Sequence, residues 1–137
     1  IVSAVLIMMC GCTDYDAKIP DTKSNKNAFE RQFKIKSDGN ATDIYFYADE
    51  FIKDPTYFYS FTASQKIIDH IVQLYSLKKN TEDKIDGYFP PPKFPWWNKK
   101  LKLQSNLYEY RNEKLRAEYT LWYHRKSQTC QFQVIYY

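Results

Sequence analysis

Alternation of apolar and polar residues is clearest in the last third of the chain. The apolar positions are Leu115, Ala117, Tyr119, Leu121 and Tyr123 in segment 115–124, and Cys130, Phe132, Val134 and Tyr136 in segment 129–137. A period of two is typical of strands with one buried face. Short connections at 112–114 and 125–128 join these strands to a third over 101–111. The pattern therefore predicts a C-terminal three-stranded antiparallel meander.

A helical period appears over residues 64–79. Ser64 stands at the N-cap, Lys78 and Lys79 complement the C-terminal dipole, and one face carries Ile67, Ile68, Ile71, Val72, Leu74 and Tyr75. Segments 42–51 and 56–61 are typical of strands, and 28–37 fits either a first strand or a short helix. These elements predict a single α+β domain over residues 28–137, with an antiparallel sheet packed against one main helix.

The first nine residues, IVSAVLIMM, are apolar except for Ser3, and the stretch Met9-Cys10-Gly11-Cys12-Thr13 follows before the chain turns polar. An apolar run of this length suits a secretory signal rather than a membrane span. It resembles the end of a bacterial lipoprotein signal peptide. The resemblance implies cleavage of residues 1–11, acyl chains on Cys12 that anchor the protein in a membrane, and a place in the cell envelope. Because Thr13 rather than Asp follows Cys12, it also implies the periplasmic side of the outer membrane in a diderm host.

Alternatives stay open for this N-terminal segment. Cys10 competes with Cys12 as the acylated residue, and an ordinary signal peptide or a buried N-terminal strand would also be apolar. Residues 12–27 are polar and too poor in apolar side chains to bury a core, so we expect them to form a flexible tether.

Cysteine and histidine content argues against several chemistries. Removal of Cys10 and acylation of Cys12 leave Cys130 without a disulfide partner, and its strand pattern predicts a small buried hydrophobe. No Cys or His spacing typical of zinc sites occurs, and no glycine-rich phosphate loop, so we expect no metal and no cofactor. The net charge of +4 is mild. In the envelope it favours anionic lipid head groups or an acidic protein over nucleic acid.

Two aromatic surfaces are candidates for binding. The segment 90–97 is rich in proline and tryptophan, and the binding residues that we predict there are Phe94, Trp96, Trp97, Lys99 and Lys100. In the alternative, this loop folds back and its indole rings close the core, with one ring inside and one partly exposed. The second surface is the tyrosine-rich strand faces, which carry Tyr45, Tyr47, Tyr57, Tyr59, Tyr108, Tyr110 and Tyr137. Cross-strand pairing that stiffens the sheet is the alternative there.

Carboxylates give the main enzymatic alternative. Asp43, Asp49, Glu50 and Asp54 surround the second and third segments of the sheet, and two of them at the right separation would suit glycoside hydrolysis. A weak calcium-loop pattern occurs at Glu82, Asp83 and Asp86. We predict no catalytic residue. The chain is interpreted as a lipid-anchored, non-enzymatic module that binds a protein partner in the envelope, in an assembly, inhibitor or immunity-type role. The alternatives are a glycan-acting enzyme and a module for lipid or polysaccharide.

Overall fold

The computed structural model describes residues 17–51, 53–81 and 94–137. The signal-like segment with Cys12, the acidic positions 82–86 and the prolines at 90–92 lie outside the described residues. Helices and strands follow in the order α1 (Lys23–Phe33), β1 (Ala41–Asp49), β2 (Thr56–Ala63), α2 (Gln65–Leu74), β3 (Lys78–Asn80), α3 (Lys99–Leu103), β4 (Asn106–Asn112), β5 (Ala117–His124) and β6 (Thr129–Tyr136).

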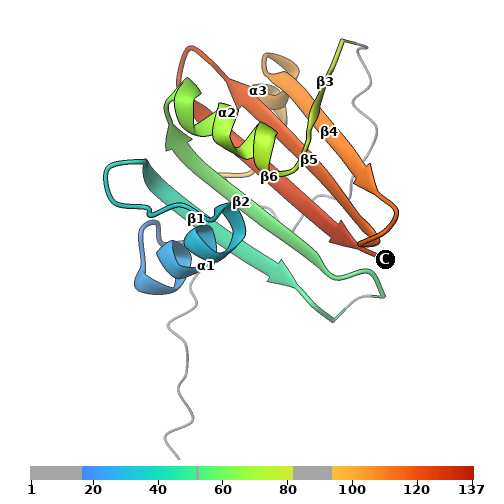
Figure 1. Ribbon diagram of the computed structural model, residues 1–137. Coiled ribbons are helices and arrows are strands. Elements are labelled where there is room, and N and C mark those ends of the chain that lie inside the picture. The colour runs from blue at the N-terminus through green and yellow to red at the C-terminus, as the bar shows by residue number, and fades with distance from the viewer. Residues whose placement is uncertain (1–16, 52, 82–93) are drawn as a thin grey trace, which may run out of the picture.

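The six strands form one antiparallel sheet in the order β1-β2-β6-β5-β4-β3 (Figure 1). The α+β class and the C-terminal meander β4-β5-β6 are confirmed. The last strand of the meander pairs with β2, so that Tyr59 stands opposite Phe132. This pairing joins the N-terminal hairpin to the meander and places β1 and β3 at the two edges.

Helices α1 and α2 cover the same face of the sheet (Figure 1), and the main core lies beneath them. Phe33 of α1 is its centre, with ring centroids 4.9 Å from Phe29, 5.3 Å from Phe61 and 5.0 Å from Phe132. Tilted and edge-to-face contacts of this kind add about 0.5–1.5 kcal/mol per pair beyond the burial of apolar area. Cys130 is fully buried in the same core, as predicted, and its burial raises the pKa of the thiol well above the usual range.

The opposite face of the sheet is also covered, where the alternation had predicted one covered side. Trp122 is 6 % exposed and Thr120 is 4 % exposed, although both point away from the helices α1 and α2. The segment from Phe94 to α3 packs on this face through Trp97. Trp122 was assigned to the outer face correctly, but a large ring there provides the apolar area that holds a second layer.

The folded part begins earlier than the predicted boundary at residue 28. Thr22 caps α1 by accepting a hydrogen bond from the Asn25 backbone N at 3.1 Å. Asn25 is fully buried, and its Nδ2 donates to the carbonyl oxygens of Ile19 and Ile44 at 2.8 and 2.9 Å. Residues 23–27 are therefore helix and not tether. The Asn25 side chain satisfies two backbone carbonyl groups, which a count of apolar residues does not register.

The main helix ends at Leu74, before the predicted end at residue 79. Ser76 has a left-handed φ of 54°, and the Leu77 backbone N donates to the Val72 carbonyl oxygen at 2.8 Å. Leu77 is then buried, and Lys78 and Lys79 belong to strand β3 instead of the helix terminus. The strand predicted over 101–111 likewise begins at residue 106, because 99–103 form α3.

Candidate functional site

Trp97 belongs to the core of the second face. It is 8 % exposed, and its ring makes edge-to-face contacts with Phe58 at 5.1 Å and with Trp122 at 5.7 Å between centroids. The segment thus folds back on the sheet, with one indole inside. Little of the Trp97 ring is left for an external partner.

Phe94 and Trp96 lie in a stack beside it, both half-buried. The Phe94 and Trp96 ring centroids are 5.1 Å apart and the rings are nearly parallel. Trp96 also stacks on Tyr45, with ring centroids 5.5 Å apart. The Trp96 Nε1 donates a hydrogen bond to the Ala17 carbonyl oxygen at 2.7 Å. These contacts cover much of the surface of the Phe94 and Trp96 rings. The exposed members of the predicted binding set are Lys99 and Lys100, and a binding role for the set stays a prediction.

Gln131 fixes this segment to the sheet, which the sequence analysis did not foresee. Its Oε1 accepts from the Asn98 backbone N at 2.8 Å, and its Nε2 donates to the Asn98 carbonyl oxygen at 3.2 Å. The side-chain amide of Gln131 thus bonds both backbone groups of Asn98, and Asn98 in turn caps α3 by accepting from the Leu101 backbone N. The one sequence signal was a glutamine on the same strand face as a tryptophan.

The sequence pattern also does not predict the inward position of Lys102. Its Nζ lies 3.8 Å from the ring centroid of Trp97 and 4.0 Å from that of Trp122. Burial, with a smaller contribution from the nearby charge of Lys99, lowers the pKa of the Lys102 amine to about 7. The side chain points inward and attaches α3 to the sheet.

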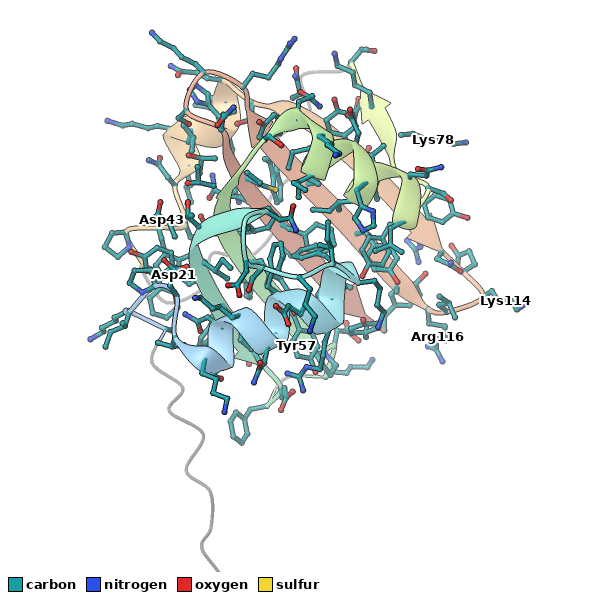
Figure 2. All side chains as sticks on the ribbon, turned by 60° about the vertical axis from the view of Figure 1, so that its left-hand side comes forward. Asp21, Asp43, Tyr57, Lys78, Lys114 and Arg116 are labelled. Carbon is teal, nitrogen blue, oxygen red and sulfur yellow. The ribbon has the colours of Figure 1, made fainter. Side chains whose placement is uncertain are left out.

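A cleft of about 570 Å³ opens on the helical face, between α1, α2 and the sheet. We call it the tyrosine cleft. Its lining comprises Ala28, Arg31, Gln32, Lys34, Phe46, Glu50, Tyr57, Tyr59, Tyr75, Tyr119 and Tyr136. Pockets that hold ligands usually have this size and combine apolar walls with a few polar groups. Figure 2 labels Tyr57, which lies on β2 beside α1.

Hydrogen bonds hold the inner tyrosines of this cleft in place. The Tyr59 hydroxyl donates to Gln32 Oε1 at 3.3 Å, the Gln32 Nε2 donates to the Tyr75 hydroxyl at 2.6 Å, and Tyr75 donates to the Gln32 carbonyl oxygen. Tyr75 stacks on Tyr119 with centroids 4.3 Å apart. Burial raises the pKa of Tyr59 and Tyr75 far above the ordinary value, and raises the pKa of Tyr57 to about 12. The hydroxyls are therefore donors at neutral pH.

The rim of the tyrosine cleft carries two exposed cations. Arg31 and Lys34, near the C-terminal end of α1, form no salt bridge within the part of the chain that the structure describes. The one carboxylate in the lining, Glu50, accepts a hydrogen bond from the Tyr57 hydroxyl at 2.8 Å. The cleft thus offers aromatic walls and cations to a ligand.

The sequence analysis predicted some of the residues that line this cleft. Tyr57 and Tyr59 were among the tyrosines predicted for a binding face, whereas Tyr119 and Tyr136 were assigned to core strand positions and Tyr75 to the apolar face of the helix. The other predicted tyrosines, Tyr45, Tyr47, Tyr108, Tyr110 and Tyr137, do not line the cleft. Tertiary structure brings the five cleft tyrosines together from β2, β5, β6 and the C-cap of α2, and no local pattern contains that information.

The carboxylates predicted for an enzyme do not converge around Asp43. Asp43 and Asp49 occupy opposite ends of β1, which places them about 20 Å apart at 3.3 Å per residue. Glycosidases hold their two carboxyl groups about 5–10 Å apart. Figure 2 shows Asp43 at one end of β1, beside Asp21, whose carboxylate accepts hydrogen bonds from the backbone N of Asp43 and Ile44. Of the four carboxylates, Glu50 alone lines the tyrosine cleft.

Residues 17–51, 53–81 and 94–137 contain no cluster of three or more His, Cys, Asp or Glu side chains that would hold a metal ion. Within the same ranges, every helix is too short or too polar to cross a bilayer. Comparison of the chain with protein-family models, with curated proteins and with solved structures finds no match.

Proposed function

We propose that this chain is a lipid-anchored, non-enzymatic binding module that holds a protein partner in the cell envelope through the tyrosine cleft. The observation that carries the proposal is the cleft itself, with five tyrosines and two cations in its lining that form no ion pair in the described structure. The aromatic walls bind apolar area, and the cations attract an anion. The occupant that fits is an aromatic or aliphatic side chain of the partner with a carboxylate beside it.

Rigidity of the cleft supports this proposal. Tyrosine contributes a large contact area at low cost in conformational entropy. Here Gln32 holds Tyr59 and Tyr75 before any partner arrives, so little ordering is left to offset the binding energy. Tyr136 is 36 % exposed and forms the outer wall, with its ring 5.8 Å from Tyr57. It is the residue best placed to meet a partner first.

The anchor and the envelope location rest on residues 1–13. Metabolic labelling with a palmitate analogue tests them directly. We expect incorporation into the wild type and into Cys10→Ser, and none into Cys12→Ser. Labelling of Cys12→Ser at the wild-type level would assign the acyl chain elsewhere.

Photocrosslinking tests the binding site. Benzoylphenylalanine at position 136 should crosslink one envelope protein, and the same probe at Leu103, which is 66 % exposed and lies on α3, should not. The crosslinked protein, once purified, should bind the wild type at least tenfold more tightly than Arg31→Gln or Tyr136→Ser. Equal binding by wild type and both variants would place the partner on another surface, and the tyrosine cleft would lose its proposed role.

A further inference from the structure

One end of the sheet concentrates positive charge on two neighbouring segments. Lys99 and Lys100 lie on α3, Arg125 and Lys126 lie in the β5–β6 connection, and all four are exposed. Segments 94–106 and 119–137 contain no acidic residue. Figures 1 and 2 both show α3 and this connection at the same end of the sheet. We call these four residues, together with Leu103, the basic end.

Packing brings the two segments close together. Gln131 holds the backbone of Asn98 at the start of α3, and Gln131 stands only three residues beyond the end of the β5–β6 connection at residue 128. Three residues of strand span about 10 Å. The two segments that carry the four cations are therefore close neighbours at one end of the sheet.

Two carboxylates near this end accept hydrogen bonds from neutral side chains. Asp69 lies on α2, and its Oδ1 accepts a hydrogen bond from Gln65 Nε2 at 2.9 Å. Asp43 lies at the start of β1 and accepts from the Thr62 hydroxyl at 3.4 Å. Neither forms a salt bridge with a cation of the basic end in the described structure.

An apolar side chain stands among these cations. Leu103, the last residue of α3, is 66 % exposed. Lys102 beside it points inward onto two indole rings and holds the helix on the sheet. A fixed apolar side chain flanked by lysines suits a bilayer interface, where apolar groups enter the acyl boundary and cations face the head groups.

The reach of the chain points to the same surface, a step that rests on the proposed anchor at Cys12. Four residues separate Cys12 from Ala17, and the five steps of chain between them span at most about 18 Å. The Ala17 carbonyl oxygen accepts a hydrogen bond from Trp96 Nε1, three residues before Lys99. An acylated Cys12 would therefore hold this end of the domain near the bilayer.

We infer that the basic end docks on an anionic lipid bilayer, with Leu103 at the acyl boundary and Lys99, Lys100, Arg125 and Lys126 against phosphate head groups. The test uses the full chain with Cys12→Ser, so that no acyl anchor contributes, and sedimentation with phosphatidylcholine vesicles that contain or lack phosphatidylglycerol. We expect sedimentation with the anionic vesicles, little with the neutral ones, and a steep loss with added salt.

Charge variants locate the surface. Each cation close to an anionic bilayer contributes about fivefold to the partition coefficient, so changing all four to Gln should lower binding several hundredfold. A matched control changes four exposed lysines away from this end, Lys23, Lys53, Lys78 and Lys114, to Gln and has the same net charge. We expect the control to retain most of the binding. Equal losses in the two quadruple variants would attribute binding to net charge and overturn the inference.

Leu103→Ser distinguishes a bilayer from an acidic protein. We expect at least a tenfold loss of vesicle binding with unchanged binding to soluble polyglutamate. If Leu103→Ser leaves vesicle binding unchanged, or if the protein prefers polyglutamate to vesicles, the surface is no lipid-docking site. Arg31→Gln and Tyr136→Ser should bind vesicles as the wild type does, so this result is independent of the tyrosine cleft.

Discussion

Lys102 offers a direct test of how the second face of the sheet is held. Its amine lies within 4.0 Å of two indole centroids, with no salt bridge in the described part of the chain. Burial lowers its pKa from 10.5 to about 7, whereas the faces of Trp97 and Trp122 favour the charged form. A cation–π contact contributes about 0.5–2 kcal/mol, and removing an ammonium from water costs several. Burial should therefore dominate.

The free-energy cost of a charged Lys102 amine in the folded state follows from these opposing effects. A shift from 10.5 to about 7 corresponds to at most about 5 kcal/mol. The two cation–π contacts with the indoles stabilise the charged form by about 1–4 kcal/mol. The half-buried amine also keeps part of its hydration. We expect a net cost of about 1–2 kcal/mol for the charged amine. The unfolded chain binds more protons than the folded one between the lowered pKa of the folded state and 10.5, so stability rises with pH across this window and is constant below it.

Lys102→Met removes the charge but keeps the length of the side chain. At about pH 6 we expect the variant to unfold with a free energy about 1–2 kcal/mol above that of the wild type, and the gain should shrink by about pH 9.5. Urea unfolding at both pH values measures it. Lys100→Met, on an exposed position of the same helix, is the control and should change stability by less than about 0.5 kcal/mol. If Lys102→Met is less stable than the wild type by the same amount at both pH values, the indoles hold an ammonium and the burial argument is wrong.

Three further outcomes check other contacts. Gln131→Leu removes both hydrogen bonds to the Asn98 backbone and should cost about 1–3 kcal/mol in urea unfolding. Trp97→Ala should cost about 3–5 kcal/mol, and Trp96→Ala distinctly less, because Trp97 alone is buried; equal melting temperatures would contradict this assignment. Glu30, whose carboxylate accepts hydrogen bonds from a serine backbone N and hydroxyl, has its pKa lowered below 4.5. Its stabilisation is present above pH 4.5 and is lost as the pH falls through the folded pKa, so Glu30→Gln should show a weaker acid dependence of stability.

The period-two pattern of apolar residues predicted most of the strands. The β5 and β6 ranges differ from their predicted segments by two residues or fewer, because apolar residues such as Tyr119, Leu121 and Phe132 recur at every second position. The predicted boundaries that were wrong depend on tertiary contacts. Leu77 is buried in the core just before β3, and Asn25 is buried where it donates a hydrogen bond to the carbonyl oxygen of Ile44.

The candidate surfaces were harder to predict, for a related physical reason. The tyrosine cleft combines Arg31 of α1, Tyr57 of β2 and Tyr136 of β6, which only the tertiary fold brings together. The proline–tryptophan segment was recognised as aromatic and basic, but burial of Trp97 depends on Trp122, twenty-five residues later in the chain. Composition identifies the residue types and cannot assign them to the inside or the outside of the domain.

The two proposed surfaces lie at opposite ends of β6. Thr129 begins this strand beside the basic end, and Tyr136 ends it at the tyrosine cleft. Seven steps of strand separate them by about 23 Å. With β6 upright on the membrane, a domain docked through Leu103 and its neighbouring cations would hold Tyr136 about that far from the head groups. With the acyl anchor proposed at Cys12, the short chain to Ala17 would allow the basic end to touch the membrane while Tyr136 stays accessible to a partner.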